Sequence, residues 1–149
     1  QNIKTINSVG TSSWTDGSVK TGKTYYYKIK TVVKTQNGEQ TSGFSNVKSA
    51  KAVPAKTTLK AKASDAKNVK LTWSKVKGAS GYEIYRSNSK DGKCSKVKTI
   101  SKGSTTSYKN GKLKKSTTYY YKIRAYRKVN GKKVYGSYSS VVSVKTKAK

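Results

Sequence analysis

Residues 113–126 read LKKSTTYYYKIRAY, and the six residues TYYYKI within this stretch, Thr118–Ile123, occur a second time at Thr24–Ile29. Every second position after Thr118 carries an apolar or aromatic residue, namely Tyr119, Tyr121, Ile123 and Ala125. A period of two is typical of a β-strand with one buried face. The stretch therefore predicts a strand, and its recurrence indicates that the strand is duplicated.

The duplication extends well beyond these six residues. Tyr25 and Tyr119 are 94 positions apart (119 − 25), and this offset also pairs Ile6 with Ile100, Trp14 with Tyr108, Gly17 with Gly111, Val19 with Leu113 and Val47 with Val141. Matching NGEQTSGFSNV with NGKKVYGSYSSV requires an adjustment of one residue near Asn37 and Asn130. Because a unit of this length is a small domain, we interpret residues 1–53 as the C-terminal part of one domain and residues 54–149 as a complete second domain.

The complete copy carries the signals of an all-β structure. Segments with strand patterns lie at residues 69–73, 82–86, 96–100 and 119–126. Asn130-Gly131 predicts a tight hairpin that leads into a last strand around Tyr138–Val144. Pro54 cannot donate to a strand ladder and marks the boundary between the copies. About seven short strands without a helical period predict an antiparallel β-sandwich.

Three stretches of the sequence have a familiar pattern: VPAKTTLKA from Val53, VKLTWSKVKGASGYEIYRS from Val69 and LKKSTTYYYKIRAY from Leu113. In these stretches the complete copy resembles a fibronectin type III domain of the kind found in tandem in surface and secreted proteins of Gram-positive bacteria. The resemblance covers the whole chain, with one partial and one complete copy. It implies an immunoglobulin-like sandwich, a fold that serves many functions.

The resemblance also implies structural roles for single residues. Trp73 matches the core tryptophan of the second strand, and Leu113 with Tyr119 matches a leucine–tyrosine corner of the family. Lys115 stands where that corner usually has proline, and the first copy has Thr21 there. The residues with an implied structural role are Trp73, Tyr82, Leu113 and Tyr119 in the complete copy and Val19 and Tyr25 in the first.

The net charge of the chain is +29, from 34 Lys and Arg residues against five Asp and Glu residues. Such a chain repels itself and associates with polyanions through attraction that salt weakens. Almost all of the basic residues are Lys, which lacks the planar fork with which Arg reads phosphates and bases. We therefore expect diffuse association with anionic cell-wall polymers or polysaccharide, and only non-specific binding of nucleic acid.

The sequence offers little for catalysis. It contains no His, the commonest general base and metal ligand. Four acidic residues fall in turns or loops, and Glu83 lies on a strand at a position that alternates outward; the four are Asp16, Glu39, Asp65 and Asp91. Because no two carboxylates are paired, we expect no catalytic residue, no metal and no cofactor.

The single cysteine, Cys94, excludes an intrachain disulfide. It lies in DGKCSK, in the loop after the third strand of the complete copy. One interpretation is a tolerated exposed loop residue. The other is a reactive or intermolecular thiol, because neighbouring lysines favour the thiolate.

The tyrosines divide between the two faces of the predicted sheet. Those in phase with the core are Tyr25, Tyr27, Tyr82, Tyr119 and Tyr121. Residues of the opposite phase on neighbouring strands form a candidate ligand surface made of Tyr85, Tyr120, Lys122, Arg124 and Tyr126. This surface suits sugar stacking or a single-stranded polyanion. The alternative is cross-strand packing that stiffens an exposed sheet.

These observations predict a non-catalytic spacer and adhesion module of an extracellular, secreted or cell-wall-associated bacterial protein. No apolar run approaches the roughly 20 residues of a membrane span. Two alternatives stay open: a dedicated polysaccharide- or polyanion-binding module, and accessory domains of an extracellular carbohydrate-active or wall-degrading enzyme.

Residues 1–53 raise a question of their own, because the first copy lacks a match for Trp73 and Tyr82. Its inner face then has no opposing sheet, and so small a part does not bury enough surface to stay ordered alone. We therefore expect it to be ordered only beneath a cover. Upstream residues or neighbouring domains of the parent chain, a partner chain or a swapped set of strands would supply that cover.

Overall fold

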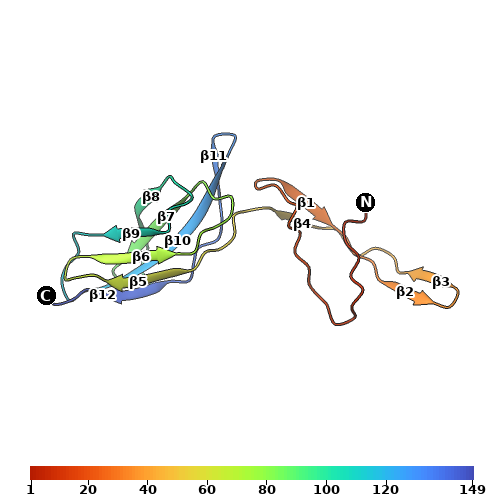
Figure 1. Ribbon diagram of the computed structural model, residues 1–149, viewed down its shortest axis with the longest axis horizontal. Coiled ribbons are helices and arrows are strands. Elements are labelled where there is room, and N and C mark those ends of the chain that lie inside the picture. Colours follow the sequence, from red (N-terminus) through yellow and green to blue (C-terminus); the bar gives the residue numbers. More distant parts are fainter.

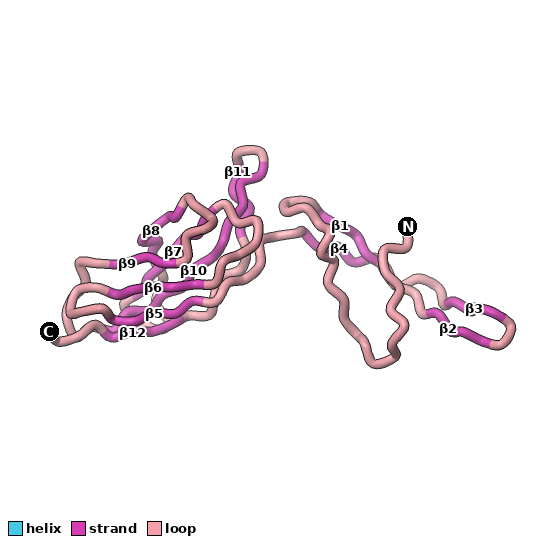
Figure 2. Tube along the Cα trace, in the orientation of Figure 1, coloured by secondary structure: helices cyan, strands magenta, loops and turns pink.

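The computed structural model describes residues 1–149, which form strands, turns and loops without a helix, as Figure 2 shows. The twelve strands fall into two groups. The first group is β1 Thr24–Tyr27, β2 Val32–Thr35, β3 Gly38–Thr41 and β4 Lys48–Lys51. The second group is β5 Leu59–Ala63, β6 Val69–Trp73, β7 Gly81–Ser87, β8 Ser95–Ile100, β9 Ser107–Asn110, β10 Thr118–Val129, β11 Lys132–Tyr135 and β12 Val142–Lys145. The two groups lie at opposite ends of an elongated molecule (Figure 1).

The second group forms two antiparallel sheets that enclose a core. One sheet has the order β5-β6-β9, and the other has the order β11-β10-β7-β8. β12 joins the second sheet by pairing with residues 118–121 of β10, while β11 pairs with residues 126–129. The antiparallel β-sandwich predicted from the sequence is confirmed.

The chain after the hairpin forms two strands, where the sequence predicted one around Tyr138–Val144. β11 ends at Tyr135 and β12 begins at Val142. Between them a side chain replaces one ladder bond, since the Ile123 N–H donates to the Ser139 Oγ at 3.1 Å. The backbone bond from the Ser139 N–H to the Ile123 carbonyl remains, at 2.7 Å. The predicted last strand is therefore confirmed from Val142 onward and wrong for residues 138–141.

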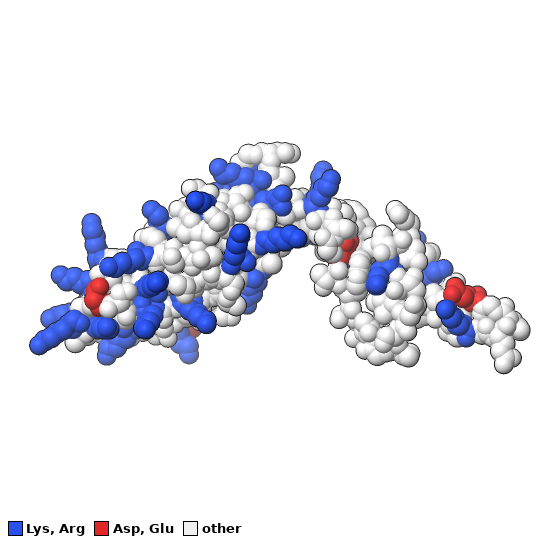
Figure 3. Space-filling view, in the orientation of Figure 1, with Lys and Arg blue, Asp and Glu red and all other residues white.

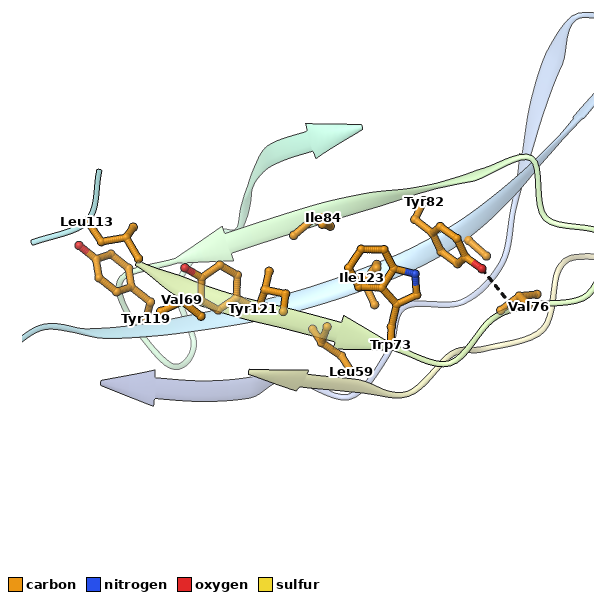
Figure 4. Close-up of a cluster of buried hydrophobic side chains, with 12 residues drawn as sticks. Leu59, Val69, Trp73, Val76, Tyr82, Ile84, Leu113, Tyr119, Tyr121 and Ile123 are labelled. Atoms are coloured by element: carbon orange, nitrogen blue, oxygen red, sulfur yellow. Dashed lines mark hydrogen bonds between the residues drawn. The ribbon is translucent and has the colours of Figure 1, made fainter. Parts of the chain in front are cut away.

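The core between the sheets is small and rich in tyrosine (Figure 4). The rings of Trp73 and Tyr82 lie 5.4 Å apart between centroids. The Tyr82 hydroxyl accepts the N–H of Val76 at 2.9 Å, and the Tyr121 hydroxyl donates to the Asn110 Oδ1 at 2.9 Å. Tyrosine serves as a core residue here because its ring buries apolar area and its hydroxyl finds a partner.

Both copies contain the same corner on the strand that carries TYYYKI. The Lys114 N–H donates to the Tyr119 hydroxyl at 3.0 Å, and the Lys20 N–H donates to the Tyr25 hydroxyl at 2.9 Å. Leu113 is buried beside the corner of the complete copy. The corner hydrogen bond forms in both copies although neither has proline at its usual position.

The repeat of 94 residues recurs in the backbone pairing. Tyr25 opposes Ala50 in β4 as Tyr119 opposes Val144 in β12. The offset also holds through the hairpins, since Thr35 opposes Gly38 as Val129 opposes Lys132. The one-residue adjustment expected there is wrong. The strand pairing keeps the offset of 94 residues through both hairpins. Asn37-Gly38 therefore lies one position later in its hairpin than Asn130-Gly131 does in the other.

Residues 1–53 form two separate antiparallel pairs, β1 with β4 and β2 with β3, and none of these residues is buried. Four strands form here with no sheet over them, and the expected cover by a neighbouring domain or a partner chain stays a prediction. Gly22 lies against the side chains of Val129 and Val134 from the β10–β11 hairpin.

Candidate binding surface

Glu83 on β7 lies at the centre of the outer face of the larger sheet. Its side chain points away from the core, as its phase predicted, but only 1% of it is exposed. Its Oε2 accepts the Tyr85 hydroxyl at 2.7 Å and the Arg124 Nη2 at 2.9 Å. Its Oε1 accepts the Lys133 Nζ at 3.0 Å and the Tyr135 hydroxyl at 3.2 Å. The sequence did not predict this burial, because the covering side chains come from other strands.

The environment of Glu83 favours its ionised form. Desolvation raises the pKa of the carboxyl, but hydrogen bonds from Tyr85, Arg124 and Lys133 outweigh it and lower the pKa from 4.5 to about 2. Burial, followed by the hydrogen bond to Glu83, raises the pKa of the Tyr85 hydroxyl above its ordinary range. Lys96 of β8 adds a third cation at 3.5 Å from Oε1. Glu83 thus joins β7 to β8, β10 and β11.

The guanidinium of Arg124 is stacked among three tyrosine rings. Its Cζ lies 3.7 Å from the centroid of Tyr135, 4.9 Å from that of Tyr138 and 5.4 Å from that of Tyr85. The Lys122 Nζ lies 4.4 Å from the centroid of Tyr138. Such contacts contribute about 0.5–1 kcal/mol each at exposed sites. The rings of Tyr85, Tyr135 and Tyr138 are therefore already in contact with cations of the same domain.

The structure brings three residues of the predicted candidate surface together. Tyr85, Lys122 and Arg124 lie on one face of β7 and β10, with Lys122 opposite Tyr85 in the ladder. Tyr120 lies further along β10, opposite Ser87 of β7, and is half-buried. None of the ring-to-cation contacts involves Tyr120, so its ring stays apart from the stack around Arg124.

Tyr126 is the residue of the predicted surface that the structure buries. It is 1% exposed, and its hydroxyl donates to the Ile100 carbonyl at 3.3 Å. Gly81 lies directly opposite on β7, and the tyrosine ring covers the space that a side chain there would fill. The prediction of Tyr126 as a contact residue is wrong in this respect, because the outward phase of a strand does not ensure exposure.

Sequence reasoning missed three residues of this surface. Lys133 and Tyr135 are on β11, and the pattern of alternating residues after Asn130-Gly131 was a signal for them. Tyr138 lies in the loop after β11, with its ring 5.2 Å from that of Tyr85. A loop residue follows no strand period, so the sequence held no signal for its position.

The chain resembles several solved structures. It aligns with the chicken CNTN1 FN1–FN3 domains at 22% identity and a TM-score of 0.55, over 89% of this chain and 46% of that one. It aligns with an Fn3-like protein from Clostridium thermocellum at 28% identity and a TM-score of 0.51, over 64% of this chain and 92% of that one. The chain has the fibronectin type III fold.

A third structure extends this likeness. The sixth fibronectin type III domain of human fibronectin type III domain containing protein 3 aligns at 18% identity and a TM-score of 0.55, over 67% of this chain and 92% of that one. The chain spans less than half the length of the chicken structure. No family profile matches the chain, and no curated protein matches its sequence.

Basic residues cover the fibronectin type III sandwich on the face shown in Figure 3. Residues 54–149 hold 26 of the 34 basic residues but only three of the five acidic ones. Two of the acids serve turns: the Asp16 Oδ1 accepts the Ser18 N–H, and the Asp65 Oδ1 accepts the Lys67 N–H. With Glu83 buried, few carboxylates remain to offset the cations at the surface.

Other kinds of site find no support in the structure. No group of three or more His, Cys, Asp or Glu side chains is arranged to hold a metal ion. Cys94 is half-buried and has a free thiol. The chain contains no helix with the length and apolar character needed to cross a membrane.

Proposed function

We propose that the chain is a non-catalytic spacer and adhesion segment of a bacterial extracellular or cell-wall-associated protein. Its rigid sandwich separates other parts of such a protein, and its lysines associate with anionic surface polymers. The fibronectin type III fold supports this proposal, since many cell-surface domains share the sandwich architecture. The resemblance to tandem domains of Gram-positive proteins supports the bacterial context.

The distribution of charge is the observation on which the proposal depends. Three of the five carboxylates, those of Asp16, Asp65 and Glu83, accept hydrogen bonds within the chain. On the face drawn in Figure 3 the cations are spread widely over the surface. Single exposed contacts contribute only about 0–1 kcal/mol and are screened by salt, so many of them must act together.

The outer face of the larger sheet fits a structural part better than a sugar-binding part. Its rings are in contact with Arg124 and Lys122, and its one carboxylate is bound by three cations. These contacts link β7, β8, β10, β11 and the loop after β11. We therefore assign this surface to stiffening the sheet, which suits a spacer.

Titration with a poly(glycerol phosphate) polymer and with an uncharged polysaccharide of similar length tests the proposal. The phosphate polymer should bind, and the logarithm of its binding constant should fall linearly with the logarithm of salt concentration between about 50 and 200 mM. The uncharged polysaccharide should not bind. The Tyr120→Ala variant should bind the phosphate polymer as well as the unchanged chain does.

The opposite results would favour a dedicated glycan-binding module. Binding of the uncharged polysaccharide that disappears in Tyr120→Ala, with the fold intact by circular dichroism, would show that an aromatic contact is responsible. A binding constant that does not change with salt would rule out diffuse attraction as the mechanism.

A further inference from the structure

The outer face of the smaller sheet consists of lysine and hydroxyl side chains. Val69, Leu71 and Trp73 of β6 are buried, so the residues that alternate with them point outward. The outward residues of the three strands are Lys60 and Lys62 on β5, Lys70 and Thr72 on β6, and Ser107 and Lys109 on β9. All four lysines are exposed. These six residues, the lysine face, include no acidic and no aromatic residue.

Three of these lysines form a row across the sheet, the lysine row. Lys62 is directly opposite Lys70, and Lys70 is directly opposite Lys109. Because neighbouring strands lie about 4.8 Å apart, the row spans about 10 Å. Like charges directly opposite each other destabilise a sheet. Protection of the sheet edges does not account for the row, since Lys70 lies on the middle strand.

The chain itself does not neutralise the lysine row. Every ion pair of the structure involves Glu83 of the larger sheet. The ammonium groups of the row lie over no aromatic ring, since the ring contacts of the chain involve other lysines and arginines. Asp65, in the loop between β5 and β6, forms no ion pair, and its Oδ1 accepts the Lys67 N–H at 2.8 Å and the Asn68 Nδ2 at 2.9 Å. The charge of the row is therefore available to an external anion.

A shallow hollow of about 290 Å³ adjoins the row and is lined by Ser64, Lys70, Ser107, Tyr108 and Lys109. It brings two ammonium groups and two serine hydroxyls together, and all four can donate hydrogen bonds. Lysine binds phosphate as a point charge, and hydroxyls complete the coordination of its oxygens. The ring of Tyr108 packs against the core between the sheets. The hollow therefore offers charge and donors to a phosphate group.

We propose that the lysine row binds a linear phosphodiester polymer that runs across β5, β6 and β9, with its phosphates over Lys62, Lys70 and Lys109. Nucleobases gain affinity by stacking on aromatic side chains. The lysine face has no such side chain, so the phosphates of the polymer are the groups that it binds. This inference rests on the proposed function, and it assigns to one face the association that the proposal gives to the surface as a whole.

Calorimetric titration of the chain with poly(glycerol phosphate) tests this site. The triple variant Lys62→Gln, Lys70→Gln, Lys109→Gln should bind at least about tenfold more weakly at about 50 mM salt. The slope of the logarithm of its binding constant against the logarithm of salt concentration should be smaller by about 2, because each phosphate contact on a single strand contributes about 0.7. Its midpoint of urea unfolding should be no lower than that of the unchanged chain, since repulsion within the row is removed.

The matched control is Lys77→Gln, Lys93→Gln, Lys132→Gln, which removes the same charge from exposed positions outside the lysine face. It should weaken binding by less than about threefold, because exposed charges farther away than a Debye length are screened. Equal losses in the two triple variants would overturn the site while leaving diffuse association intact. No binding by the unchanged chain would refute the proposed function and this inference together.

Two further probes test the kind of anion. Inorganic phosphate at the same phosphate concentration should bind at least about tenfold more weakly than the polymer, because it lacks the gain from linked contacts. An oligothymidylate with the same number of phosphates should bind no more tightly than poly(glycerol phosphate). Equal affinity for inorganic phosphate would make this a site for a single ion, and tighter binding of the oligothymidylate would make nucleic acid the partner. Either result would overturn the proposal.

Discussion

Glu83 on β7 and Arg124 on β10 stand directly opposite each other in the ladder, and the Arg124 Nη2 donates to the Glu83 Oε2 at 2.9 Å. The guanidinium stacks on Tyr135, while Lys133 reaches the second oxygen of the same carboxylate. One acidic residue thus organises the outer face of a sheet that is otherwise strongly cationic. Removing its charge leaves these cations facing one another without a counter-ion.

The first prediction concerns this carboxylate. Glu83→Gln should lower the free energy of unfolding by about 1–3 kcal/mol, because charge-assisted hydrogen bonds are lost. Urea unfolding followed by circular dichroism measures the effect. The matched control is Asp91→Asn, an exposed acid, which should change stability by less than about 0.5 kcal/mol. Equal effects of the two variants would contradict the role given to Glu83.

A second prediction follows from the pKa of Glu83, which is about 2 in the folded chain against an ordinary 4.5. Because the folded value is the lower one, ionisation of Glu83 stabilises the fold above pH 4.5, and this contribution is lost as the pH falls toward 2. The stability difference between the unchanged chain and Glu83→Gln should therefore narrow over this interval. A difference independent of pH would show that the charge is not what matters.

The third prediction compares the two corner tyrosines. Tyr119→Phe should cost about 1–3 kcal/mol of unfolding free energy, because the Lys114 N–H loses its acceptor beside a buried ring. Tyr25→Phe removes the equivalent hydrogen bond from a part of the chain without a buried residue, so its cost should stay below about 0.5 kcal/mol. Urea unfolding of both variants checks this, and a larger cost for Tyr25→Phe would contradict it.

The sequence predicted the sandwich because its signals are local. The alternation in Tyr119–Ala125 and the repeat of 94 residues are visible without knowledge of distant contacts, and both recur in the strand pairing. The residues that face the core could also be predicted from the sequence, since a period of two assigns alternate residues to the core.

The outer face was less predictable, because its burial depends on residues from other strands. Tyr126 and Glu83 have the outward phase, yet the first is covered against Gly81 and Tyr135 and the second lies beneath Arg124. The break between β11 and β12 depends on the Ser139 side chain, which no strand pattern reveals. The alternation along a strand predicts the face of the sheet on which a residue lies. Packing against residues of other strands decides how much of that residue is exposed.

The last prediction tests why Tyr126 is buried. Gly81 faces it across the ladder, and a Cβ at Gly81 would overlap the Ile100 carbonyl oxygen and lie 2.6 Å from the Tyr126 hydroxyl. Gly81→Ala should therefore displace β8 or the ring and cost about 1–3 kcal/mol. The control Gly10→Ala adds a Cβ with no atom within 4 Å and should be neutral. Thermal unfolding of both variants decides the matter, since a neutral Gly81→Ala would mean that Tyr126 has room to move.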